Sequence, residues 1–84
     1  MSVMRAAAQP TRVKIINMLL ERDQMTHEEI MRELRQQHAE LLDKHLEVLT
    51  NIRFLTASRQ NNSVSYQLQH SKIGAIQQFM SAIH

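Results

Sequence analysis

The side chains in this sequence that could hold a metal ion or move a proton are five histidines and eight carboxylates. No two histidines stand four residues apart, as ligands on one helix face would, and none has the carboxylate spacing of a zinc ligand set. There is no cysteine, so thiolate metal sites and disulfides are excluded. We therefore expect neither a metal site nor another bound cofactor. The histidines are His27, His38, His45, His70 and His84.

The sequence also lacks the motifs of a catalytic site. It has no recognisable nucleophile–base pair, no glycine-rich phosphate loop and no H-E-x-x-H motif. Its one glycine, Gly74, lies within a helical pattern and leaves no loop for an anion cradle. We expect a protein that acts by binding and is not an enzyme.

Charge is distributed unevenly along the chain. All eight acidic residues lie between positions 21 and 47, where four basic residues leave a net charge of −4. The flanking segments carry six basic residues and no acidic one, a net charge of +6. Such segregation is compatible with a face that binds a polyanion, or with complementary halves of one fold or dimer, and it does not distinguish them.

The chain has 84 residues and a mass of 9.8 kDa, enough for one small domain spanning 1–84. A domain of this size buries roughly 60–65% of its unfolded surface, which favours association with a second subunit. No apolar run is long enough to span a membrane, and the first residues do not form a secretory signal. With 43% apolar and 21% charged residues, the composition predicts an ordered intracellular domain.

The spacing of apolar residues predicts that helices form the first half of the chain. An alanine-rich stretch predicts a short helix over 3–8, and Pro10, which suits a first helical turn, precedes a second over 11–22. Thr26 and Glu29 form a T-x-x-E capping box that predicts a third helix over 26–35.

In the second half of the chain, the spacing of apolar residues changes from a helical to an alternating pattern and back. Leucines spaced three and four residues apart predict a helix over 38–52, and alternating residues around Asn61 and Asn62 predict a hairpin over 55–68. A helical stripe predicts a last helix over 71–83. The expected fold is therefore mainly α with a two-stranded β-hairpin wing, the order of a winged helix-turn-helix.

Four segments of the chain, in order, also resemble the sequence motifs of one protein family. Residues 8–15 (AQPTRVKI) resemble the opening A-x-P-T-R-x-x-I, and residues 25–34 (MTHEEIMREL) resemble L-T-x-x-E-L-x-x-x-L. Residues 45–49 (HLEVL) resemble H-L-x-x-L, and residues 64–68 (VSYQL) resemble V-x-Y-x-L. Together they resemble the ArsR family of winged helix-turn-helix regulators, over about residues 6 to 68.

The resemblance implies a cytoplasmic bacterial or archaeal protein that represses transcription as a homodimer on double-stranded DNA. Each subunit would place its recognition helix in the major groove of an inverted-repeat operator. Its hairpin wing would lie on flanking DNA. The DNA-binding residues expected on this basis are Thr11, Arg12, Arg35, His38, Ala39, Glu40, Leu41, Lys44, Arg59, Asn61 and Asn62.

The segment before H-L-x-x-L departs from the family pattern, which usually has hydroxyl and amide side chains there. Residues 38–44 read HAELLDK, and the carboxylates of Glu40 and Asp43 would lie near phosphates that repel them. An alternative function is therefore a protein-interaction module that docks a protein partner through the acidic face of the helix 38–52, without sequence-specific DNA binding.

The terminal helices are expected to form the dimer interface. In the family this interface is usually built from the N- and C-terminal helices, and the last helix here carries an apolar stripe. Ile73, Ile76 and Phe79 could instead pack on the core of their own chain. The expected interface residues are Val3, Met4, Ala7, Ile73, Ile76, Phe79, Met80 and Ile83.

Overall fold

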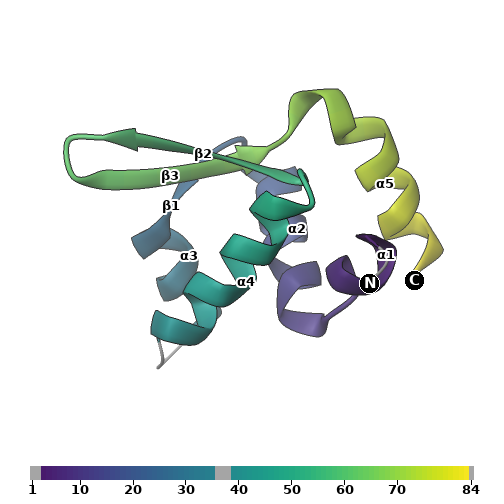
Figure 1. Ribbon diagram of the computed structural model, residues 1–84, viewed down its shortest axis with the longest axis horizontal. Helices are drawn as coiled ribbons and strands as arrows, with labels where there is room; N and C mark the ends of the chain where they lie inside the picture. Colours follow the sequence, from purple (N-terminus) through teal and green to yellow (C-terminus); the bar gives the residue numbers. More distant parts are fainter. Residues whose placement is uncertain (1–2, 36–38, 84) are drawn as a thin grey trace.

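Helices and strands follow one another in the expected order in the computed structural model, which describes residues 3–35 and 39–83 (Figure 1). The predicted helix boundaries hold to within two residues, and the last helix begins with a 3-10 turn. The elements are α1 (Val3–Ala7), α2 (Pro10–Glu21), β1 (Met25–Thr26), α3 (His27–Leu34), α4 (Ala39–Asn51), β2 (Leu55–Gln60), β3 (Ser63–Leu68), η1 (His70–Lys72) and α5 (Ile73–Ala82).

The sheet has one strand more than the sequence predicted. The short strand β1 pairs antiparallel with β3, with Met25 opposite Tyr66, so the strand order is β1-β3-β2. Two residues are too few to show an alternating pattern, and Thr26 already belonged to the predicted helix 26–35. The added strand matters because it fixes the beginning of α3 against the middle of the hairpin.

Local capping explains where α2 and α3 begin. Gln9 is the N-cap of α2, and its side-chain oxygen accepts hydrogen bonds from the backbone N–H groups of Thr11 and Arg12, at 2.8 and 3.1 Å. The predicted capping box of α3 is confirmed: Glu29 N–H donates to Thr26 Oγ1, and Thr26 N–H donates to Glu29 Oε1. These bonds satisfy N–H groups that have no partner inside a helix.

Residues in the left-handed backbone conformation form the turns in the second half of the chain. Asn61 and Asn62 have φ angles of 49° and 68°, the pair of positive values that a type I′ hairpin turn requires, so the predicted turn is confirmed. Arg53 ends α4 at φ 68°, and the N–H of Phe54 donates to the carbonyl of Leu49 at 3.0 Å. This Schellman-type closure directs the chain from α4 into β2.

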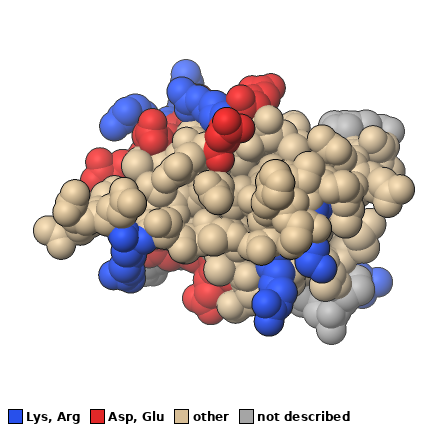
Figure 2. Space-filling model, turned by 90° about the horizontal axis from the view of Figure 1, so that it is seen from above, with Lys and Arg blue, Asp and Glu red and all other residues tan. Residues whose placement is uncertain are grey.

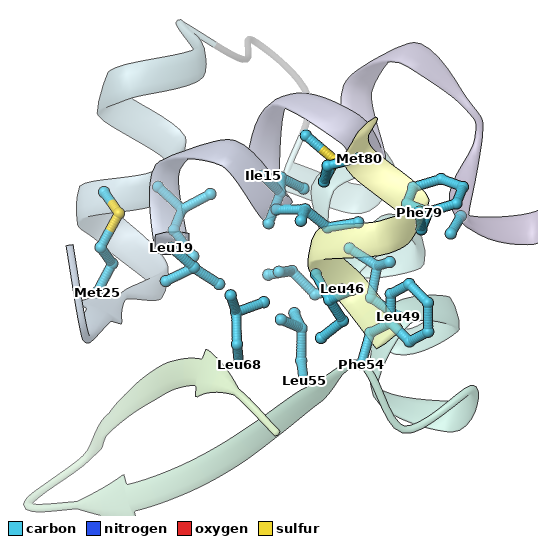
Figure 3. Packing of buried hydrophobic residues seen from close by; sticks show 14 of the residues in the cluster. Ile15, Leu19, Met25, Leu46, Leu49, Phe54, Leu55, Leu68, Phe79 and Met80 are labelled. Atoms are coloured by element: carbon cyan, nitrogen blue, oxygen red, sulfur yellow. The ribbon is translucent and has the colours of Figure 1, made fainter. Parts of the chain in front are cut away.

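One hydrophobic core joins the helices to the hairpin base (Figure 3). Leu55 and Leu68 extend from the strands toward Leu19 of α2 and Leu46 of α4, and all four are buried. Phe54, which the sequence analysis did not single out, packs edge-to-face on Phe79 with ring centroids 6.0 Å apart. No helix in the described part of the chain combines the length and apolar character needed to cross a membrane.

The core also takes up half of the residues expected at the dimer interface. Ala7 and Ile76 are 0% exposed, Phe79 2% and Met80 5%, so these four side chains pack inside their own chain. For Ile76 and Phe79 this is the alternative stated above, packing on the core of their own chain. Because a side chain buried in its own chain offers little surface to a partner, the predicted dimer contact would fall to the other four residues. Ile73 is half-buried against the same core, whereas Val3, Met4 and Ile83 are 45%, 51% and 40% exposed.

Candidate nucleic-acid interface

Helix α4 has a buried face and a solvent face, and these separate its leucines. Leu42, Leu46 and Leu49 are at most 1% exposed and anchor the helix in the core. Leu41 is 54% exposed, and Lys44, one turn further along, is exposed as well. The core contacts therefore orient α4 so that Leu41 and Lys44 are presented to solvent, as a helix that enters a DNA groove requires.

A groove of about 410 Å³ separates α4 from the hairpin. Its wall on the helix side carries the carboxylates of Asp43 and Glu47, and its wall on the hairpin side carries Arg59 and Tyr66. His27 lies at the groove where α3 begins, and its Nε2 is 2.6 Å from Asp43 Oδ1. One of the two carboxylates therefore already has a partner, which can neutralise it when the imidazole is protonated.

Charged groups on both walls of this groove affect the pKa of Tyr66. Burial raises the pKa of its phenol, the Asp43 carboxylate raises it further, and the Arg59 guanidinium lowers it. Charges on the helix wall and on the hairpin wall therefore act on this one hydroxyl in opposite directions. The groove is thus a mixed-charge surface, in which Arg59 opposes the acidic side of α4.

The hairpin tip is exposed and polar. Arg59 on β2 and the turn residues Asn61 and Asn62 are all exposed. Their donors and acceptors extend beyond the helical part of the molecule, because the hairpin projects from it at one end (Figure 1). This placement agrees with the expected wing, in which a cation and two amides could reach a DNA backbone.

The structure assigns Thr11 and Arg12 to other contacts than those expected. The backbone N–H groups of both residues donate to Gln9, so they are not free to bind phosphate. The Arg12 guanidinium donates from Nε to His45 Nδ1 at 3.1 Å and from Nη1 to the carbonyl of Ala6 at 2.9 Å. Arg12 therefore connects α1 and α4 inside the fold, and its contact with DNA stays a prediction.

His45 has a structural role inside the fold. It is half-buried and accepts the hydrogen bond from Arg12. Burial lowers the pKa of its imidazole, and the nearby Arg12 charge lowers it further. Both effects favour the neutral ring, which is the form that can accept a bond at Nδ1.

The remaining predicted DNA contacts lie around the start of α4. Arg35 is exposed and ends α3 in the left-handed conformation, at φ 55°. Ala39 and Glu40 are the first residues of α4, but only their backbone is described. His38 lies outside the described residues.

Charged side chains border a broad uncharged face (Figure 2). This view looks onto the hairpin and α5, whose exposed residues include Thr56, Ser58, Gln67, Gln77 and Gln78. Lysines, arginines and carboxylates gather along the two long edges of the view. The outer side of the sheet therefore lacks the positive charge that phosphate binding requires.

No three histidine, aspartate or glutamate side chains come together as metal ligands in the described ranges. His27 and Tyr66 are two of the groove residues that sequence reasoning did not assign to the interface. His27 follows the N-cap of α3 directly, but its partner Asp43 lies on another helix 16 residues away, and no local pattern joins the two.

Comparison with known proteins gives relatives in structure but none in sequence. No protein-family model and no curated protein matches the chain. The solved structure of a transcriptional regulator homologue from Pyrococcus horikoshii is similar with a TM-score of 0.85 at 18% identity, over 94% of this chain and 81% of that one. The transcriptional repressor PagR of Bacillus anthracis is similar with a TM-score of 0.76 at 23% identity, over 90% and 86%.

A third similar structure is that of an ArsR family transcriptional regulator. Its TM-score is 0.74 at 18% identity, and the match covers 95% of this chain and 80% of that one. The chain therefore has the winged-helix fold of these regulators, which confirms the fold expected from the sequence. The names of the three proteins describe transcriptional regulation and no enzymatic activity, in line with the expectation of a binding protein.

Proposed function

We propose that this winged-helix chain is a cytoplasmic transcriptional repressor that binds an inverted-repeat DNA operator as a homodimer. The observation that carries the proposal is the arrangement of α4 and the hairpin. The core fixes α4 with Leu41 and Lys44 exposed, and the hairpin projects Arg59, Asn61 and Asn62 beside it. One fold would thus present a helix to the major groove and a polar wing to flanking DNA.

A second copy of the chain would be held at the opposite end from the wing. Helices α1 and α5 lie at that end together with both termini (Figure 1). Val3, Met4 and Ile83, the large hydrophobic residues exposed there, support a dimer interface smaller than the one the sequence implied. Two-fold pairing of two recognition helices is what reads an inverted repeat.

The carboxylates of α4 favour a second candidate, a module that binds a basic protein segment. Asp43 and Glu47 both line the groove, and both are exposed. A cationic peptide would gain from these charges, whereas DNA phosphates would be repelled by them. Removal of one carboxylate therefore changes the two candidate activities in opposite directions.

The first experiment selects bound sequences from a random DNA pool and titrates the best one at two salt concentrations. We expect an inverted repeat with half-sites about one helical turn apart and binding that weakens steeply with salt. Lys44→Gln and Arg59→Gln should each weaken binding and reduce the salt slope by about one, if each side chain contacts one phosphate in the bound half-site.

Asp43→Asn is the variant that separates the two candidates. It should tighten DNA binding about two- to fivefold, as expected when an exposed charge repulsion of about 0.5–1 kcal/mol is removed. Asp23→Asn is the matched control, because exposed Asp23 lies in a different groove with His70 and Gln77. If no sequence is enriched and Asp43→Asn weakens binding to a lysine-rich peptide, the repressor proposal is wrong and the protein-binding candidate replaces it.

A further inference from the structure

Leu41 is an exposed apolar residue that lies outside the hydrophobic core. The packing of α4 depends on Leu42, Leu46 and Leu49, which are buried, whereas Leu41 keeps 54% of its surface in water. Its neighbours one turn along the helix are exposed Lys44 and half-buried His45. Since nothing in the core requires a leucine at this position, its apolar side chain is available to a ligand.

The position of Leu41 separates it from the other exposed hydrophobic residues. Val3, Met4 and Ile83 belong to the end of the molecule that holds α1, α5 and the termini. Among the described residues, Leu41 is the large hydrophobic side chain exposed on the helix-turn-helix. One leucine is far smaller than the apolar patches of a few hundred Å² that mark protein-docking surfaces, but it matches a single methyl group.

The major groove offers such a methyl group. Thymine is distinguished there by its 5-methyl, an apolar group, whereas the other bases are distinguished by hydrogen-bond donors and acceptors. The N-terminal part of a recognition helix is the part that meets base edges, and Leu41 is the third residue of α4. Lys44, one turn further on, can hold the helix in place by binding a phosphate or a guanine.

We infer that Leu41 determines specificity by covering the 5-methyl group of one thymine in each operator half-site. The inference rests on the proposed function, since it names one base that the same interface reads. It assigns to Leu41 an apolar contact with a base edge, in contrast to the polar contact with a phosphate or a guanine that is expected of Lys44.

The experiment replaces each thymine of the selected operator by uracil, which removes only the methyl group. At one symmetric pair of positions, uracil should weaken binding by the native chain about fourfold per half-site, the effect of burying one methyl-sized group. Leu41→Ala should bind the unmodified operator more weakly and show no further loss with uracil at those positions. Its urea midpoint should equal that of the native chain, because Leu41 lies outside the core.

The controls distinguish this inference from the function on which it rests. Lys44→Gln should weaken binding yet keep the native sensitivity to uracil. If the native chain binds the operator but no uracil position weakens binding, or if Leu41→Ala retains the sensitivity, the inference is wrong and the repressor proposal stands. If the native chain binds no DNA sequence selectively, the proposed function fails, and the thymine contact fails with it.

Discussion

At the scale of single residues, the hydrogen bond between Arg12 and His45 has the clearest consequence. It joins α2 to α4, and the second bond of Arg12 adds the carbonyl of Ala6 in α1. Because α4 carries the proposed reading face, this contact helps to position it. A motif residue expected to contact DNA thus also links α1, α2 and α4.

The neutral form of His45 should stabilise the fold. Since burial and Arg12 lower its pKa in the folded chain, the unfolded state takes up a proton first as the pH falls. The contribution is present above the ordinary histidine pKa of about 6.5 and is lost as the pH falls through the lower folded value. We expect urea midpoints measured at about pH 7.5 and about pH 5.5 to differ more for the native chain than for His45→Gln.

Glutamine is the informative replacement because its amide oxygen can accept the bond from Arg12 but does not titrate. His70→Gln removes an exposed histidine and serves as the control, with the pH dependence of the native chain expected to persist. Equal pH dependence in the native chain and His45→Gln would show that His45 does not carry the effect.

At the scale of elements, the exit from α4 decides how the wing leaves the helix. Arg53 takes the left-handed conformation there, and the hydrogen bond from Phe54 to Leu49 closes the helix end. Phe54 then enters the core against Phe79 of α5. One turn thus sets the direction of β2 and also anchors the C-terminal helix.

Replacement of Arg53 by glycine should stabilise the protein. A residue with a Cβ is strained at φ 68°, and glycine is not, so Arg53→Gly should raise the free energy of unfolding by about 0.5–1 kcal/mol in urea titrations. Arg22→Gly is the control, because Arg22 caps α2 at φ −122° and should lose about the same amount. A less stable Arg53→Gly would mean that the arginine side chain contributes more than the turn conformation costs.

At the scale of the whole molecule, the core and the two ends of the molecule have different roles. The core runs from Ala7 in α1 to Met80 in α5 and leaves the hairpin free to project at one end. Helices α1 and α5 lie at the other end, where Val3, Met4 and Ile83 are exposed. A dimer built there would leave both wings accessible.

Substitution at this end should separate the proposed dimer without unfolding it. We expect light scattering at micromolar concentration to give about twice the 9.8 kDa mass of one chain, and Met4→Glu combined with Ile83→Glu to give the monomer mass. Leu41→Glu places one such charge on a similarly exposed residue of α4 and should remain dimeric. A native chain that scatters as a monomer would contradict the homodimer.

The amino-acid sequence was sufficient for the features that depend on residues close together in the chain. The start of α2 at Pro10, the capping box of Thr26 and Glu29, and the hairpin turn at Asn61 and Asn62 all follow from contacts over a few positions. Helical and alternating periods then gave the order of the elements, because each period depends on which face of one element is buried.

Tertiary packing decided the features that join distant residues. Arg12 finds His45 33 positions away, His27 finds Asp43 16 positions away, and β1 becomes a strand by pairing with β3. An apolar stripe likewise cannot show which surface will cover it: Ile76 turned to its own core and Ile83 stayed exposed. Burial and pairing energies depend on what lies opposite a residue in space, which periodicity along one helix does not specify.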